Sequence, residues 1–264
     1  MYDRPFIVSW GFGVNSTALL LGLHERGIRP DLITAADTGG WGGIGEKPET
    51  YAFAWDMQAW LDRVGFPPIT LVTKRSRYAS LEDNCLQKQM LPSRAYGFSS
   101  CADKWKRQPQ DRFVNHWAPA REAWAAGQKV SKALGYDAGE VRRARIPEDA
   151  KYRYVYPLID WGWDREDCVA AITRHGLPVP PKSACFFCPS STKTEVRWLA
   201  AHHPALFARA VAMERNAAGS LQTVQGLGRH WSWEGLLAND RAALDAPDVA
   251  QDQPCGCYDG GGDE

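Results

Sequence analysis

Seven cysteines have the clearest capacity for chemistry in this sequence. Cys185 and Cys188 form a CxxC pair with two phenylalanines between them, and two thiolates at this spacing can hold one metal ion or one corner of a cluster. Cys101 lies upstream, and Cys255 and Cys257 lie near the end of the sequence. With a single CxxC pair, the pattern does not match a zinc ribbon built from two such pairs. Ligands this scattered suit a 4Fe–4S cluster at least as well as zinc. That these cysteines bind no metal remains a third interpretation.

A glycine-containing loop is the second feature with chemical capacity. Residues 11–17 read GFGVNST and lie between an expected strand and an expected helix. Glycine lets the backbone turn sharply and approach a ligand, and the first turn of the helix offers unpaired N–H groups to an anion. The loop is neither a Walker A loop nor a dinucleotide GxGxxG loop. The alternative is an ordinary strand–helix turn with Ser16 as its N-cap. The residues predicted to bind nucleotide phosphate are Gly11, Phe12, Gly13, Asn15, Ser16 and Thr17.

A second candidate loop, DTGG, starts at Asp37 and directly follows the next expected strand. In an open α/β sheet, ligands bind beyond the carboxyl ends of the strands, so this loop and the first can lie side by side. We predict that Asp37 and Thr38 contribute to the nucleotide site, with the Asp37 carboxylate holding a ribose or a magnesium ion. A helix cap followed by a glycine loop is the alternative.

Basic side chains form two clusters that can clamp phosphates or stabilise charge on a transferring phosphorus. Either cluster is equally compatible with a solvated helix face. Glu140 lies three residues before Arg143 and can orient it. The clusters consist of Lys104, Lys106 and Arg107, and of Arg142, Arg143 and Arg145.

Alternating apolar runs and amphipathic stretches predict the scaffold that positions these segments. Strand, helix, strand, helix, strand in the N-terminal half implies a parallel sheet with right-handed crossovers. The expected strands are 5–9, 31–36 and 69–73, and the expected helices are 16–26, 48–64, 80–91, 106–117, 164–175, 192–202 and 204–217. Segment 129–135 is either a strand or the end of a helix. The PVPP stretch at 178–181 suggests a boundary, so we expect a nucleotide-binding α/β domain over 1–177 and a cysteine-containing helical region over 178–264.

Composition sets limits on the class of protein. The 264 residues include 44% hydrophobic and 23% charged residues, which excludes a largely disordered or fibrous chain. The sequence contains no run near the roughly 20 apolar residues of a membrane span, and no signal peptide pattern, so we expect a cytoplasmic protein. Because 31 basic residues balance 31 acidic ones, a nucleic-acid substrate would need a local basic surface. Cys85 and Cys168 are expected to be structural.

The ordered set of motifs resembles the adenine-nucleotide alpha hydrolases, the PP-loop ATP pyrophosphatases. The first loop is similar to the family pattern SGGxDS, and the match continues over residues 5–215 through DTGG, EKPETY, CADKWK, LGYDAGEVRRA, YPLIDW and KSACFFCP. The DTGG and EKPETY motifs resemble the branch similar to phosphoadenosine phosphosulfate reductase. Gly11, Phe12 and Asn15 depart from the loop pattern, standing where the family has serine, glycine and an acid. An asparagine cannot neutralise charge as a carboxylate does, which puts magnesium binding and ATP hydrolysis in question.

The resemblance implies a Rossmann-like α/β fold, in which helices flank a parallel sheet and a smaller, mostly helical C-terminal region follows. It implies ATP and Mg²⁺ as cofactors. It also implies catalytic roles for Lys106 and Arg143, with Glu140 orienting the arginine. It favours a 4Fe–4S cluster over zinc, with Cys255 as the substitute for the last of four ligands. These ligands are Cys101, Cys185, Cys188 and Cys257.

The function expected from the resemblance is an ATP-dependent, iron–sulfur-dependent sulfurtransferase. ATP would adenylate an oxygen of a nucleic-acid or small-molecule acceptor, pyrophosphate would leave, and sulfur would displace AMP. The expected partner is a sulfur donor or an electron or thiol donor protein, and no membrane partner is expected. A sulfonucleotide reductase is the alternative, although the Cys-Cys pair and the Cys-Gly-aliphatic-His ending of those enzymes are missing. A non-catalytic nucleotide-binding module is the second alternative, motivated by Asn15.

Overall fold

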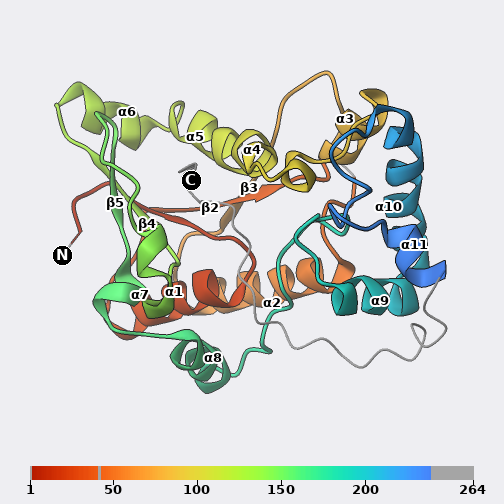
Figure 1. The fold of residues 1–264 in the computed structure, drawn as a ribbon. Helices are drawn as coiled ribbons and strands as arrows, with labels where there is room; N and C mark the ends of the chain where they lie inside the picture. Colours follow the sequence, from red (N-terminus) through yellow and green to blue (C-terminus); the bar gives the residue numbers. More distant parts are fainter. Residues whose placement is uncertain (1, 41–42, 239–264) are drawn as a thin grey trace.

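One sheet of five parallel strands organises the chain, with the strand order β3-β2-β1-β4-β5 (Figure 1). The computed structural model describes residues 2–40 and 43–238, so Cys255 and Cys257 lie outside the described residues. The strands are β1 (Phe6–Ser9), β2 (Leu32–Asp37), β3 (Ile69–Thr73), β4 (Val130–Leu134) and β5 (Tyr152–Val155). The chain runs outward from β1 through β2 to β3 and then crosses to β4 on the other side. The strand order therefore reverses between β1 and β4, which is where open α/β sheets bind ligands.

Helices cover both faces of this sheet, which confirms the expected fold class (Figure 1). Val8 faces one side, packed with Leu19 and Leu61, and Ile7 faces the other, packed with Val114 and Ala120. Successive strand residues point to opposite faces, so the apolar run of β1 supplies two cores. The helices on the first face are α1 (Val14–Glu25), α2 (Pro48–Val64) and α8 (Arg165–Arg174), and those on the second are α5 (Gln108–Val114) and α6 (Ala118–Ala125).

Short helical elements connect β3 to the second face and follow the later strands. A π-helical turn covers Asp103–Arg107, directly after the short helix that contains Cys101, and such turns are frequent at functional sites. The elements not yet described are α3 (Leu81–Gln87), η1 (Ser93–Tyr96), α4 (Ser100–Ala102), η3 (Ala138–Arg143), α7 (Pro157–Asp160), α9 (Lys193–His202), α10 (Pro204–Ala217), η4 (Ala218–Ser220) and α11 (Trp233–Ala238). None of the helices in the described part of the chain is long and apolar enough to cross a membrane.

The C-terminal helices pack against an insertion from the first part of the chain. Leu81 and Trp105 share one buried apolar cluster with Phe186, Leu199 and Trp233. The region after residue 178 is mostly helical, as expected, and its apolar core includes residues from the segment 81–105. The boundary at residue 178 itself stays a prediction.

Candidate functional site

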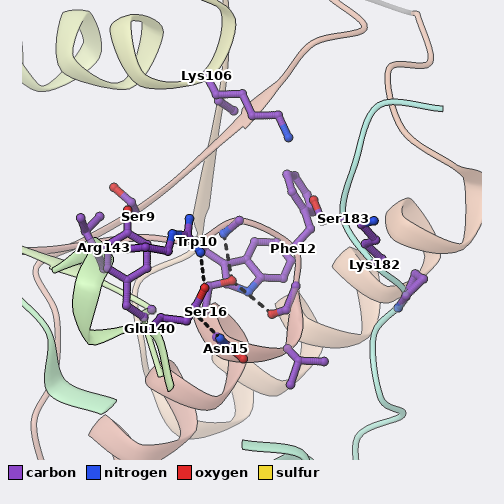
Figure 2. A pocket seen from close by; sticks show the side chains of 18 of the residues that line it. Ser9, Trp10, Phe12, Asn15, Ser16, Lys106, Glu140, Arg143, Lys182 and Ser183 are labelled. Atoms are coloured by element: carbon purple, nitrogen blue, oxygen red, sulfur yellow. Dashed lines mark hydrogen bonds and ion pairs between the residues drawn. The ribbon is translucent and has the colours of Figure 1, made fainter. Parts of the chain in front are cut away.

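A pocket opens beyond the carboxyl ends of β1 and β4, where the strand order reverses (Figure 2). The β1–α1 loop forms its floor, the η3 turn forms one wall, and the segment 181–183 forms the opposite wall. The predicted site residues that line it are Gly11, Phe12, Gly13, Asn15, Ser16, Lys106, Glu140 and Arg143. Thr17, Asp37 and Thr38 are not among the lining residues. Eight of the predicted site residues therefore line one pocket, although they come from segments far apart in the chain.

Helix α1 begins at Val14, with Gly13 as its N-cap, so the alternative in which Ser16 caps the helix is wrong. The Ser16 hydroxyl instead braces the loop, because it accepts from the Gly11 amide at 3.0 Å and donates to the Gly13 carbonyl at 3.1 Å. Phe12 replaces a glycine of the family pattern but still adopts a positive φ of 63°. Its buried ring packs on Trp10, with 4.6 Å between ring centroids, and this contact holds the strained backbone in place. The first N–H groups of α1 have no intrahelical acceptor, so they are available to an anion in the pocket.

Thr17 has a structural environment. Its hydroxyl accepts from the Trp10 indole N–H at 3.0 Å, and the residue is fully buried. This bond ties the first turn of α1 to the end of β1. A role for Thr17 in cofactor binding stays a prediction.

The Asn15 side chain connects the loop to the opposite side of the pocket. Its amide nitrogen donates to Asp137 at 2.8 Å and to Glu140 at 2.9 Å, and its amide oxygen accepts from Arg165 at 3.0 Å. Two carboxylates thus take up the amide hydrogens that an aspartate at position 15 would lack. Asp137 and Glu140 also form the capping box of η3, and the DAGE sequence is a recognisable signal for that box.

An acid at position 15, as in the SGGxDS pattern that the loop resembles, is therefore expected to destabilise the folded state. Asn15→Asp would bring three carboxylates together and remove two donors, so we expect the free energy of unfolding to fall by about 1–3 kcal/mol at neutral pH. Like charges raise the carboxyl pKa values in the folded state above their unfolded values. The ionised groups then destabilise the folded state at neutral pH, and the loss shrinks as the pH falls through the carboxyl range. Urea denaturation at several pH values measures this effect.

Asn115→Asp is the matched control, because Asn115 is exposed and contacts only Lys151 among the side chains the structure describes. It is expected to change the stability by less than about 0.5 kcal/mol. An Asn15→Asp protein as stable as the wild type at neutral pH would show that the two carboxylates do not depend on the amide.

Glu140 and Arg143 form an ion pair, as expected from their spacing. The Arg143 guanidinium also lies over the Tyr136 ring, 4.4 Å from the ring centroid, and Tyr136 stacks on Tyr156 at 5.7 Å. A guanidinium fixed by a carboxylate and an aromatic face is oriented before any ligand arrives. Glu140 therefore links the arginine to Asn15 and to the loop.

Gly135 allows β4 to end against the first turn of α1. A Cβ atom at position 135 would lie 2.7 Å from the Ser16 Cα atom and 2.8 Å from the Ser16 nitrogen. These are backbone atoms and cannot rotate away, so only glycine fits. Sequence reasoning did not single out this residue, although it lies within the LGYDAGEVRRA motif.

Gly135→Ala is expected to push the first turn of α1 away from the end of β4. The predicted binding of nucleotide should then weaken about tenfold or more. Overpacking of this kind costs about 1–3 kcal/mol in folding free energy. ATP calorimetry measures the affinity, and urea denaturation measures the stability. Gly219→Ala is the matched control, because a Cβ atom there meets nothing within 4 Å, and its ATP affinity should not change. Equal ATP affinities for the two variants would contradict the close approach.

Lys106 reaches the pocket from the second face of the sheet and forms a buried ion pair with Glu46 at 2.9 Å (Figure 2). The Glu46 carboxylate, whose residue is 2% exposed, also accepts from the Ser183 hydroxyl at 3.1 and 2.9 Å. Burial, the largest single effect, would lower the pKa of the Lys106 ammonium, but the charge and hydrogen bond of Glu46 together with the nearby Cys185 and Cys188 outweigh it, and the net shift is upward. Lys106 is therefore charged and positioned. Sequence reasoning quoted the EKPETY motif without assigning Glu46 a role.

Asp37 and Thr38 build the loop that carries Glu46. The Asp37 carboxylate accepts from the Gly39 amide at 2.8 Å and from the Tyr51 hydroxyl at 3.0 and 3.1 Å. Tyr51 in turn accepts from the amides of Gly45 and Glu46. Burial raises the pKa of Asp37, against the lowering effect of these hydrogen bonds. That Asp37 and Thr38 contribute to a nucleotide site, with the Asp37 carboxylate holding a ribose or a magnesium ion, stays a prediction.

Two predicted cluster ligands, Cys185 and Cys188, lie near Lys106, and a third, Cys101, lies near Cys188. Cys185 and Cys188 belong to one turn, closed by a 2.9 Å bond from the Cys188 amide to the Cys185 carbonyl, and the Thr38 hydroxyl lies 3.1 Å from the Cys185 sulfur. Burial raises the pKa of both thiols, the Lys106 charge opposes it, and a charge on Cys101 would raise the pKa of Cys188 further. All three cysteines are free of disulfides.

The described residues do not complete a metal site. Over 2–40 and 43–238, no three His, Cys, Asp or Glu side chains are gathered closely enough to hold a metal ion. Thiols suit a cluster as donors, and Cys101 and Cys185 pack against an apolar cluster of buried residues, but the described ligand set is not closed, and Cys257 lies outside the described residues. Cys85 and Cys168 are buried in apolar clusters, as expected of structural cysteines, and burial raises the pKa of each to about 12.

The comparisons with known proteins include a distant likeness to a solved structure. The chain matches no family model and no curated protein. Among solved structures, it is similar to the U34-tRNA thiolase NcsA from Methanococcus maripaludis with its 4Fe–4S cluster, at 13% identity and a TM-score of 0.38. The match covers 83% of this chain and 73% of that chain. A likeness of this size carries no argument about activity, which has to come from the site itself.

Proposed function

We propose that this chain binds ATP in the pocket between β1 and β4 and releases pyrophosphate by transferring AMP to an acceptor oxygen. The observation that carries the proposal is a single pocket at the switch point of the sheet, where the N-terminus of α1 faces several cationic side chains. Such a pocket suits the phosphates of a nucleotide, because backbone N–H groups and fixed cations converge on one space. The cationic side chains that line it are Lys106, Arg143, Arg165 and Lys182.

Ser9 supports the same proposal from the end of β1. Its hydroxyl lines the pocket, is buried, and has no hydrogen-bond partner among the described residues. An unsatisfied buried hydroxyl costs about 1–3 kcal/mol, which a ligand hydroxyl or phosphate oxygen can recover. The polar end of β1 is therefore suited to a bound polar ligand rather than to the apolar core.

The geometry of the pocket suggests a role for each of the residues that line it. The α1 N-terminus would hold the departing pyrophosphate, while Lys106 and Arg143 would stabilise negative charge that develops during transfer. Glu140 would keep the guanidinium oriented, and Asn15 would keep the loop attached to Glu140. Glu140 is already bonded to Asn15 and Arg143, so the described residues do not offer Mg²⁺ a free carboxylate in the pocket. No step is assigned to the metal.

The finer part of the proposal is sulfur transfer to the adenylated acceptor. Ser183 lines the pocket and Cys185 lies two residues further on, so the CxxC turn is directly adjacent to the proposed nucleotide site. Cys101, Cys185 and Cys188 would hold a 4Fe–4S cluster together with a fourth ligand, and such a cluster would supply bound sulfur beside the nucleotide. The acceptor is a nucleic acid or a small molecule.

Pyrophosphate release from ATP tests the proposal. With an acceptor present, the purified chain should bind ATP and release one pyrophosphate for each AMP that it transfers to the acceptor oxygen, and Arg143→Lys should lower the rate because lysine lacks the planar fork of arginine. Arg142→Lys, on the exposed side of the same turn, is the matched control. ATP binding without pyrophosphate release would favour the non-catalytic nucleotide-binding module. Release of sulfite from an adenine sulfonucleotide would favour the reductase.

A further inference from the structure

A second pocket lies on the other side of the segment that carries Cys101. Lys106 lines the proposed nucleotide pocket, whereas Cys101, Lys104 and Trp105 line the second one. The remaining wall comes from the stretch after β3, from α3 and from the loop that follows α3. The two pockets therefore share one short stretch of chain, but the second is not part of the nucleotide site.

Three lysines, Lys74, Lys88 and Lys104, converge on this second pocket from different elements. Among the described residues, none of these ammonium groups forms an ion pair, whereas the nearby acids are already engaged: Glu82 pairs with Arg209, and Asp103 pairs with Arg107. Asp83 accepts from the Ala79 amide and from Gln87. Because these partners of Asp83 are neutral, its carboxylate offsets at most one of the three lysine charges, and positive charge stays in excess here, in a chain whose formal net charge is zero.

The basic surface extends beyond the pocket. Arg75 and Arg77 are exposed and follow Lys74 in the sequence KRSRY, and Arg77 lies over the ring of the lining residue Tyr78, so further positive charge lies beside the pocket. A simple anion would need only the three lysines inside. Positive charge that continues outside the pocket favours a polyanion with several phosphates.

Aromatic side chains alternate with these cations. Lys88 lies 5.4 Å from the Tyr78 ring centroid and Arg77 lies 4.8 Å from it, while Lys74 lies 5.5 Å from the Trp105 centroid. Phe98, which is 62% exposed, lies beside the pocket, since its carbonyl accepts from the hydroxyl of the lining residue Ser93. Aromatic faces between backbone-binding cations are how proteins hold unpaired bases.

We propose that this second pocket and its basic rim bind a single-stranded segment of nucleic acid. The lysines and arginines contact the backbone phosphates, and Tyr78 or Phe98 stacks on an unpaired base. The aromatic wall favours a single strand, because the bases of a duplex are already stacked on one another. Binding itself does not require the nucleotide pocket; that the bound strand is the acceptor, brought beside Cys101, rests on the proposed function.

Fluorescence anisotropy with labelled 12-nucleotide RNA and DNA strands of one sequence tests the proposal. The full chain should bind at least one of the two single strands more tightly than it binds the duplex of the same sequence. The variant Lys74→Gln/Lys88→Gln/Lys104→Gln should lose affinity at least tenfold, and the slope of log affinity against log salt should fall by about 2, as expected for three phosphate contacts. Tyr78→Ala should lose about tenfold through lost stacking.

The matched control removes the same charge elsewhere, as Lys129→Gln/Lys151→Gln/Lys193→Gln, and should bind strands like the wild type. ATP calorimetry on both triple variants separates this proposal from the proposed function, since neither should lose ATP affinity. Equal losses for the two triple variants, tighter binding of the duplex, or displacement of the strand by low millimolar inorganic phosphate would each overturn the nucleic-acid site. Strand binding by a chain that does not bind ATP would overturn the proposed function alone.

Discussion

Lys106→Met is expected to lower the free energy of unfolding by about 3–5 kcal/mol, the usual result of removing one partner of a buried ion pair. The Glu46 carboxylate would remain buried with only the Ser183 hydroxyl as a side-chain donor. Urea denaturation followed by tryptophan fluorescence measures the loss. Because its pKa is raised, the charged lysine stabilises the folded chain at neutral pH, and this contribution disappears only as the pH rises through the strongly alkaline range.

The double variant Glu46→Gln/Lys106→Met is the matched control for this experiment. It removes the buried charge along with its partner, so most of the lost stability should return, while ATP binding should stay weak without the lysine. A single variant that loses less than about 1 kcal/mol would mean that the carboxylate reaches water or protonates at little cost. In that case Lys106 would not be held by Glu46.

Anaerobically purified protein is expected to contain iron and to show the broad visible absorbance of a 4Fe–4S cluster. The single variants Cys101→Ala, Cys185→Ala and Cys188→Ala are each expected to lose the iron and this absorbance, because such a cluster uses four thiolates and these three cysteines are predicted to supply three of them. Iron analysis and absorbance spectra of the four proteins check this.

Cys168→Ala is the control for the cluster variants, since Cys168 belongs to α8, is fully buried in the apolar core, and burial raises its thiol pKa to about 12. It should keep the iron of the wild type. A wild-type protein that contains zinc or no metal after anaerobic preparation would remove the cluster from the proposal. Comparing Cys257→Ala with Cys255→Ala then identifies the fourth ligand.

Elements with strong local signals could be predicted from the sequence. Helix α2 spans residues 48–64 as expected, because a proline begins it and Gly65 ends it with a left-handed backbone. Segment 129–135 could not be decided, since VSKAL has neither helical nor strand periodicity. In the structure it is β4, and Lys132 is buried within it, paired with Asp111. The surrounding sheet, not the local sequence, makes this segment a strand.

The site shows the same division between local and distant signals. The loop at 11–16 was recognisable because its glycines, its hydroxyl and the following helix are neighbours in sequence. The contacts that complete the pocket join residues far apart: Lys106 is 60 residues from Glu46, and Ser183 is 137 residues from it. Within the loop alone, Asn15 is only a departure from the acid of the SGGxDS pattern. Its amide hydrogen bonds to Asp137 and Glu140, 122 and 125 residues further on, could not be predicted from the loop sequence.

The π-helical turn at Asp103–Arg107 has a thermodynamic consequence. Lys104 and Lys106 lie two residues apart on this single turn, and they line different pockets. A ligand that shifts Lys106 also shifts the backbone that carries Lys104 and Cys101. Linkage is reciprocal, so a nucleotide that changes the affinity of the second pocket by some factor has its own affinity changed by the same factor when that pocket is filled. A nucleotide that shifts Lys106 and a ligand of the second pocket that shifts Lys104 would therefore be coupled through the five residues of this turn.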